Sequence, residues 1–100
     1  MQIEKLILNN EGSLVDVRTP EEFMGGNVVG SINISLQELD TRMEELRRLQ
    51  APLILFCASG GRSAMATQIL SQQGIECCNA GSWLDVNYLK SQSQGTWFKH

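Results

Sequence analysis

The chain has 100 residues, with eight Lys plus Arg against eleven Asp plus Glu, and a formal net charge of −3. This length corresponds to a single domain with one modest core, and the acidic balance argues against a surface that binds nucleic acid or anionic membrane. The longest apolar run, residues 53–58, is too short to cross a bilayer, and the start MQIEKLILNN lacks the basic opening of a signal peptide, so we expect a soluble, cytoplasmic protein.

The first half of the chain predicts two strands and two helices. Residues 14–17 (LVDV) form an apolar run of strand length, and residues 32–34 are a weaker strand candidate. Between them, Thr19 followed by Pro20 and by Glu22 predicts a capped helix that begins at the proline. Ser35 and Glu38 repeat this capping pattern, and the next apolar residues recur every three or four positions. We therefore expect one continuous helix from residue 36 that ends before Pro52, with Glu44 and Arg48 paired along it.

The second half continues the alternation of strands and helices. Residues 53–57 (LILFC) are continuously apolar, as in a strand buried on both faces of a parallel sheet. A helix is predicted over residues 62–73, followed by Gly74 in the left-handed conformation, with an apolar stripe of Met65, Ala66, Ile69 and Leu70. Residues 75–78 are a weaker strand candidate, and a short helix is expected from Ser82. The pattern predicts an α/β fold with a doubly wound, mainly parallel sheet and helices on both faces.

We place the domain at residues 1–90 and a C-terminal tail at residues 91–100. The run SQSQG at residues 91–95 is typical of a flexible segment. Trp97 and Phe98 could either pack back on the domain or belong to a loose end.

Three cysteines are present, Cys57 alone and Cys77 beside Cys78. Their spacing matches neither a disulfide framework nor a zinc site, and the chain's one histidine is His100 at its end. We therefore expect reduced thiols, no metal and no cofactor. In a strand, Cys77 and Cys78 would face opposite sides, and buried structural thiols are the more common case, although a resolving cysteine for Cys57 is possible.

The stretch LFCASGGRS at residues 55–63 carries the strongest chemical signal. Cys57 would end a buried strand at the carboxyl edge of the sheet, where open α/β folds bind ligands. Gly60 and Gly61 allow the loop to turn its backbone N–H groups inward, and a helix N-terminus and Arg62 add positive potential. Such an environment lowers the pKa of a thiol and makes it a nucleophile. The alternative is a small core cysteine followed by an ordinary glycine turn.

Four segments together resemble the rhodanese family, in particular its small single-domain members. They are LVDVRTPEEF at residues 14–23, GGNVVGSINI at 25–34, CASGGRS at 57–63 and NAGSW at 79–83. The resemblance implies that Cys57 takes a sulfane sulfur from thiosulfate or a persulfide donor, becomes a persulfide, and passes the sulfur to cyanide or a thiol. It also implies that the persulfide and the donor are held by the residues that follow: Ala58, Ser59, Gly60, Gly61, Arg62 and Ser63.

The resemblance further implies a small anionic donor, a thiol or cyanide acceptor and, as an option, a protein partner in a sulfur relay. Asp16, Arg18 and Glu22 would form internal ion pairs, so we interpret Arg18 and Glu22 as parts of the scaffold. Trp83 is expected to pack near the mouth of the site. The physiological donor, acceptor and partner are not specified by the sequence.

Two other functions remain open from the residues alone. Phosphatases and arsenate reductases also use a cysteine, a glycine-containing loop and an arginine, but their loop is one residue longer than the four residues between Cys57 and Arg62. The shorter ring of amides suits a single sulfur better than a tetrahedral oxyanion. The second alternative is a non-catalytic or partner-dependent module on the same fold, against which the presence of Cys57 argues.

Overall fold

The computed structural model describes residues 2–95. Its centre is a four-stranded sheet in the order β2-β1-β3-β4, in which every neighbouring pair of strands is parallel. The strands are β1 (Ser13–Asp16), β2 (Ile32–Asn33), β3 (Leu53–Cys57) and β4 (Cys77–Ser82). A parallel sheet requires crossover connections, and the helices provide them.

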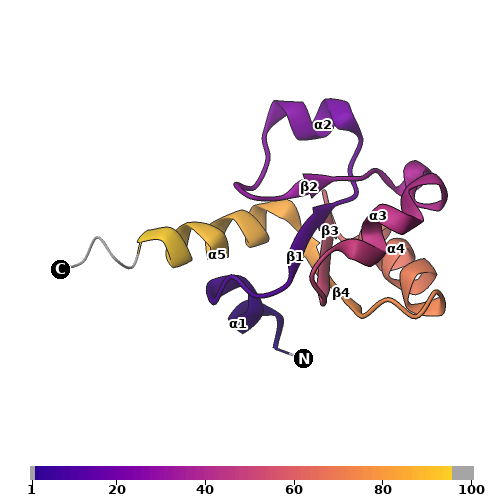
Figure 1. Cartoon of the computed structure of the whole chain (residues 1–100). Helices are drawn as coiled ribbons and strands as arrows, with labels where there is room; N and C mark the ends of the chain where they lie inside the picture. Colours follow the sequence, from indigo (N-terminus) through magenta and orange to yellow (C-terminus); the bar gives the residue numbers. More distant parts are fainter. Residues whose placement is uncertain (1, 96–100) are drawn as a thin grey trace.

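Five helices surround this sheet (Figure 1): α1 (Ile3–Leu8), α2 (Pro20–Gly25), α3 (Met43–Arg48), α4 (Gly61–Gln72) and α5 (Trp83–Gly95). One buried cluster joins Ile7 of α1 and Val86 of α5 to one face of the sheet. A second cluster joins Leu46 of α3 and Leu70 of α4 to the opposite face. The predicted α/β fold with helices on both faces is therefore confirmed.

Strand β3 lies at the centre of both clusters because all five of its residues are buried. Ile54 and Phe56 point into the α1–α5 layer, whereas Leu53 and Leu55 point into the α3–α4 layer. Since successive strand residues face opposite sides, only a continuously apolar segment satisfies both layers. This arrangement confirms the prediction for residues 53–57 and fixes Cys57 at the end of the best-buried strand.

The predicted start of α2 is confirmed in detail. The Thr19 hydroxyl accepts the Glu22 N–H at 3.2 Å, and a Glu22 carboxylate oxygen accepts the Thr19 N–H at 2.9 Å. Pro20 occupies the first helical turn, where no N–H partner is needed. Glu22 is thereby held in one orientation at the carboxyl end of β1.

The predicted continuous helix from residue 36 is wrong. Two 3₁₀ turns, η1 (Leu36–Glu38) and η2 (Asp40–Arg42), precede the short helix α3. The Leu36 N–H donates to the Val17 carbonyl at 3.1 Å, and the Ser35 hydroxyl forms no cap. The first turn is therefore anchored to the chain after β1 instead of to its own helix.

The ion pairs of this segment also differ from the prediction. Among the described residues no ion pair joins Glu44 to Arg48; Arg42 instead binds Glu38 at 2.8 Å and Glu45 at 3.0 Å. These contacts span the junction between the two 3₁₀ turns and α3. The apolar spacing nevertheless directs Leu39 and Leu46 into the core, and α3 ends before Pro52 as expected.

Helix α4 matches the predicted residues to within one position at each end, and Gly74 after it has a left-handed φ of 78°. Its buried residues are Ser63, Ala66 and Leu70. Met65 is 55% exposed, so its assignment to the buried stripe is wrong. The buried face follows positions 63, 66 and 70, and Met65 lies one residue, or about 100° of helix rotation, away from it.

The C-terminal part of the chain is more regular than predicted. Strand β4 runs from residue 77 to 82 instead of 75 to 78, and α5 extends for 13 residues, so residues 91–95 form its last part instead of a flexible run. The domain boundary at residue 90 stays a prediction, and Trp97 and Phe98 lie outside the described residues. Of the helices within residues 2–95, none combines the length and the apolar character that crossing a membrane requires.

Candidate active site

Cys57 is the last residue of β3 and is almost completely buried. It pairs in register with Ser82 at the end of β4, and the next helix, α4, begins at Gly61. The structure therefore places this thiol at the carboxyl edge of the parallel sheet, directly before a helix N-terminus. This is the location that the sequence predicted for it.

The sulfur of Cys57 is surrounded by hydrogen-bond donors. The Gly60 N–H donates to Sγ at 3.0 Å, and the Ser63 hydroxyl lies 3.5 Å from Sγ. Burial by itself raises the pKa of Cys57, but the Ser63 hydroxyl and the amides of Ser63, Gly60 and Ser59 outweigh burial and lower that pKa to about 7. A substantial share of Cys57 is consequently thiolate at neutral pH.

Gly60 allows the loop to close around the sulfur. Its φ of 103° lies in a region that side chains disfavour, and a Cβ atom there would lie 3.4 Å from the Cα atom of Gly81 on β4. Both the backbone conformation and the close approach to β4 therefore favour glycine at position 60. With this turn in place, the amide of Gly60 points at Sγ.

Asn79 of β4 connects the loop to the sheet, a role that the sequence analysis did not assign. Its amide oxygen accepts hydrogen bonds from the Ser63 hydroxyl at 2.6 Å and from the Gly81 N–H at 3.0 Å. Its amide nitrogen donates to the Gly60 carbonyl at 3.2 Å. One side chain thus fixes both loop residues that contact the sulfur of Cys57. The available signal was the polar Asn79 directly after the strand candidate of residues 75–78.

Arg62 does not direct a free guanidinium at the thiol. Its two terminal nitrogens bind the two carboxylate oxygens of Glu22 at 2.7 and 3.0 Å, and the two side chains are 35% and 36% exposed. The hydrogen bonds from Arg62 and from the Thr19 amide lower the pKa of Glu22 to about 2, so both partners are charged at neutral pH. Whether Arg62 binds substrate stays a prediction.

Asp16 and Arg18 form a buried ion pair beside the site, as expected. The guanidinium of Arg18 binds the Asp16 carboxylate with contacts of 2.8 to 3.0 Å, and it also donates to the Gly26 carbonyl at 2.7 Å. The same guanidinium lies 4.4 Å from the ring centroid of Trp83. These contacts occupy Arg18 and link β1, the segment after α2 and the start of α5.

Cys77 and Cys78 face opposite sides of the sheet, as predicted for neighbouring strand residues. Cys77 packs toward α4, with its sulfur 3.4 Å from the Ser71 hydroxyl, while Cys78 packs in the α1–α5 layer. Cys77 is in register with Leu53, at the opposite end of β3 from Cys57. At about 3.3 Å per residue, this separation along the strand does not permit a disulfide with Cys57 in this conformation.

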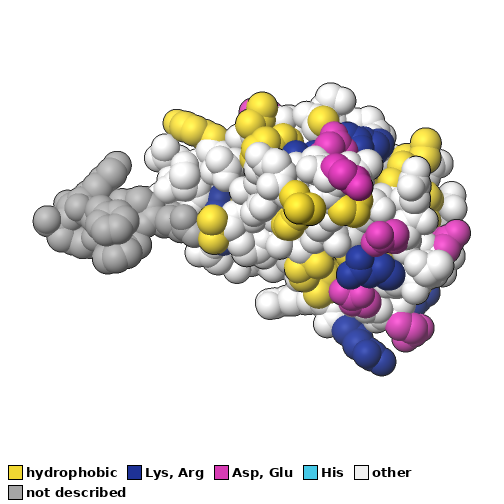
Figure 2. All heavy atoms as spheres, turned by 90° about the horizontal axis from the view of Figure 1, so that it is seen from above, with side chains coloured by type: hydrophobic (Ala, Val, Ile, Leu, Met, Phe, Trp, Pro, Cys, Tyr) yellow, Lys and Arg dark blue, Asp and Glu magenta, His cyan; other side chains and the backbone are white. Residues whose placement is uncertain are grey.

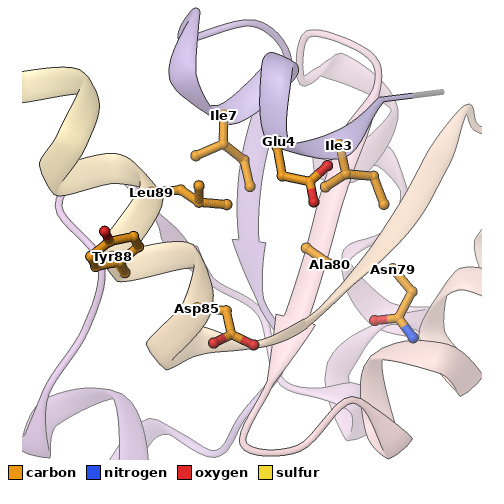
Figure 3. Close-up of a pocket in the computed structure, with 8 residues that line it drawn as sticks. All are labelled: Ile3, Glu4, Ile7, Asn79, Ala80, Asp85, Tyr88 and Leu89. Carbon is orange, nitrogen blue, oxygen red and sulfur yellow. The ribbon is translucent and has the colours of Figure 1, made fainter.

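A cavity with a volume of about 450 Å³ lies apart from the Cys57 loop. Figure 3 shows it between α1, α5 and β4, with apolar walls that include Ile7 and Leu89 and with Glu4 and Asp85 at its edges. Cys57 does not line it. Within residues 2–95, no group of three or more His, Cys, Asp or Glu side chains could hold a metal ion.

The comparison with protein-family models identifies the family. The model of the rhodanese-like domain matches residues 2–87, which is nearly the whole described chain. The chain belongs to the rhodanese family. The loop that stabilises the Cys57 thiolate therefore lies in a rhodanese domain, the family that the sequence resembled.

Several relatives of this rhodanese domain are sulfurtransferases by name. The thiosulfate sulfurtransferase PspE of Escherichia coli is 34% identical over 74 residues, which cover 72% of this chain and 71% of that protein. A relative without such a name, the uncharacterized protein YqhL of Bacillus subtilis, is 41% identical over 64 residues, which cover 64% of this chain and 50% of that protein. The chain thus spans about half the length of the first of its curated relatives.

Solved structures give the same result for the rhodanese fold. A rhodanese with anions from E. coli superimposes with a TM-score of 0.66 at 33% identity, covering 73% of this chain and 88% of that one. The human single-domain sulfurtransferase TSTD1 has a TM-score of 0.64 at 26% identity and covers 89% of this chain and 90% of that one. These structural similarities agree with the family assignment: the chain has the rhodanese fold.

Proposed function

We propose that this protein transfers a sulfane sulfur from thiosulfate or a persulfide donor, through a persulfide on Cys57, to cyanide or a thiol. The observation that carries the proposal is the ring of donors around Sγ, which lowers the pKa of Cys57 to about 7. Related proteins named thiosulfate sulfurtransferases support the reaction class.

In the first half-reaction, the Cys57 thiolate attacks the outer sulfur of the donor. With thiosulfate, an S–S bond forms to Cys57, the S–S bond of the donor breaks, and sulfite leaves with the electron pair of the broken bond. In the second half-reaction, cyanide attacks the outer sulfur of the persulfide, thiocyanate leaves, and the Cys57 thiolate is regenerated. No general base is required because the attacking group is already ionised.

The loop residues 58–63 would hold the persulfide through their amides. The N–H groups that now surround Sγ come from the turn and the first turn of α4, whose dipole also favours negative charge. The terminal sulfur of a persulfide carries the negative charge one atom further from Cys57. It can accept hydrogen bonds from backbone N–H groups of the same loop. We propose that Arg62 places one positive charge at the edge of this ring of amides, which we call the amide cradle, where Arg62 is paired with Glu22.

A small anionic donor and a thiol or cyanide acceptor are the proposed small-molecule partners, and a sulfur-relay protein is a further option. A relative in B. subtilis bears the name of a putative sulfur carrier protein, YrkF. We place the reaction in the cytoplasm, because free thiols such as Cys57, Cys77 and Cys78 are typical of a reducing compartment.

The test is intact-mass measurement after a single exposure to thiosulfate. Wild-type protein should gain the mass of one sulfur atom, which cyanide then removes, and Cys57→Ser should gain none. Cys77→Ser is the matched control and should retain the full uptake. Uptake that survives in Cys57→Ser and disappears in Cys77→Ser would overturn the assignment, and hydrolysis of an aryl phosphate without any persulfide would favour the phosphatase alternative.

A further inference from the structure

Two arginines lie near the mouth of the site, and each forms an ion pair with a carboxylate. Arg18 is bound by Asp16 and is buried, and Arg62 is bound by Glu22 through two hydrogen bonds. Figure 2 views the molecule from the side on which α2 lies, and the basic and acidic side chains on this face are interspersed. Within residues 2–95, neither of these two arginines therefore offers an unpaired positive charge beside Cys57.

Glu22 is fixed in this position by more than its partner. It is the third residue of the α2 capping box, so its carboxylate also accepts the Thr19 N–H at 2.9 Å. To bind Arg62, an anion would have to displace the Glu22 carboxylate, which is hydrogen-bonded to both Arg62 and the Thr19 N–H. It would also meet the negative charge of Glu22 and of the Cys57 thiolate.

Donors of the proposed reaction differ in the charge that they bring to this entrance. Thiosulfate is a dianion, whereas a persulfide R–S–SH is neutral when protonated and a monoanion when ionised. With a persulfide, the Cys57 thiolate attacks the outer sulfur, the S–S bond of the donor breaks, and RS⁻ leaves with the electron pair of that bond. The products are Cys57–S–SH and RS⁻, so the total charge is the same before and after the step.

We propose that Glu22 is a specificity-determining residue which, by holding Arg62, disfavours thiosulfate and selects an organic persulfide as the sulfur donor. The inference rests on the proposed function and narrows its donor. Glu22 acts through Arg62 and through its own charge, and contributes no atom to the reaction. The amide cradle, which serves either donor, is unaffected by it.

The experiment compares Glu22→Gln with wild-type protein for two donors, thiosulfate and 2-mercaptoethanol persulfide, whose organic part is uncharged. The readout is the second-order rate constant for gain of one sulfur atom at Cys57, from quenched samples measured by intact mass. Gln keeps an oxygen that can accept the Thr19 N–H, so α2 should remain capped. Glu21→Gln, an exposed position in the same helix, is the matched control for net charge.

Glu22→Gln should raise the rate constant for thiosulfate on the order of fivefold to tenfold at low salt and by less as ionic strength rises. The rate constant for the persulfide should change by less than about twofold, and Glu21→Gln should alter neither rate by more than that. An unchanged or lower thiosulfate rate in Glu22→Gln, with uptake at Cys57 intact, would overturn the inference alone. If neither donor labels Cys57 in any of the proteins, the proposed function itself fails, and the inference fails with it.

Discussion

The Ser63 hydroxyl is the side-chain group that holds the pKa of Cys57 low, and Ser63→Ala tests how much it contributes. The hydroxyl lies 3.5 Å from Sγ but only 2.6 Å from the Asn79 amide oxygen and 3.2 Å from the Gly60 carbonyl oxygen, so three acceptors compete for its one proton. A hydrogen bond to a charged group contributes about 1.5 to 3 kcal/mol, which is about one to two pKa units. The long distance to sulfur points to the lower end, so we expect the pKa to rise from about 7 to about 8.

The assay is the rate of Cys57 alkylation by iodoacetamide as a function of pH, with the modified residue identified by peptide mass. The midpoint of the profile should move up by about one pH unit in Ser63→Ala. The rate at high pH should also rise by about threefold, because a less stabilised thiolate is the better nucleophile. The midpoint, unlike the rate at a single pH, separates these two effects.

Ser71→Ala is the matched control for this experiment. It removes a hydroxyl from the same helix, and that hydroxyl lies 3.4 Å from the sulfur of Cys77 instead of Cys57. The Cys57 midpoint should not change in this variant. If Ser63→Ala also left the midpoint unchanged, the hydroxyl would donate to Asn79 or the Gly60 carbonyl instead of Sγ, and the backbone amides would have to account for the low pKa.

Two further predictions concern stability. Gly12→Ala should lower the free energy of unfolding in urea by about 2 to 3 kcal/mol, because φ is 79° and the new Cβ would lie 2.3 Å from the Pro52 carbonyl oxygen. Gly30→Ala, with a φ of 84° and open space, should cost only the backbone strain, about 1 kcal/mol; equal losses would refute the steric argument. The pKa of Glu22 is lowered to about 2, mainly by Arg62, so its stabilising contribution is complete above about pH 4.5 and is lost as the pH falls toward 2. The difference in Tm between wild type and Glu22→Gln should therefore vanish near pH 2, and a difference that persisted there would contradict the ion-pair explanation.

The sequence was sufficient to predict the elements whose signals are local. The apolar run of β3 and the Thr19–Glu22 capping box each depend on residues close together in the chain, and both are confirmed. The position of Cys57 followed from these elements, since the carboxyl end of a buried parallel strand and the next helix N-terminus must meet there. Fold class and the candidate nucleophile were therefore predictable together.

The errors arose where a distant contact replaces a local one. The helix expected from residue 36 is interrupted because the Leu36 N–H bonds to Val17, a contact across two segments of the fold. The pairing of Glu22 with Arg62 joins residues 40 positions apart and was likewise not predicted. Neither contact leaves a pattern in the residues near it.

The activation of Cys57 depends on the neighbouring strand as well as on the loop that contains it. Between Leu55 and Phe56 the register with β4 shifts, so that Asn79 pairs with Leu55, Gly81 pairs with Phe56, and Ala80 is the additional residue. This bulge lets the Asn79 oxygen accept the Gly81 N–H while its side chain reaches the loop on the α4 side. Because the same oxygen also accepts the Ser63 hydroxyl, the local geometry of β4 and the orientation of a donor to Sγ are set by one side chain. A change in the length of β4 would thus alter the pKa of Cys57 without touching the cysteine loop itself.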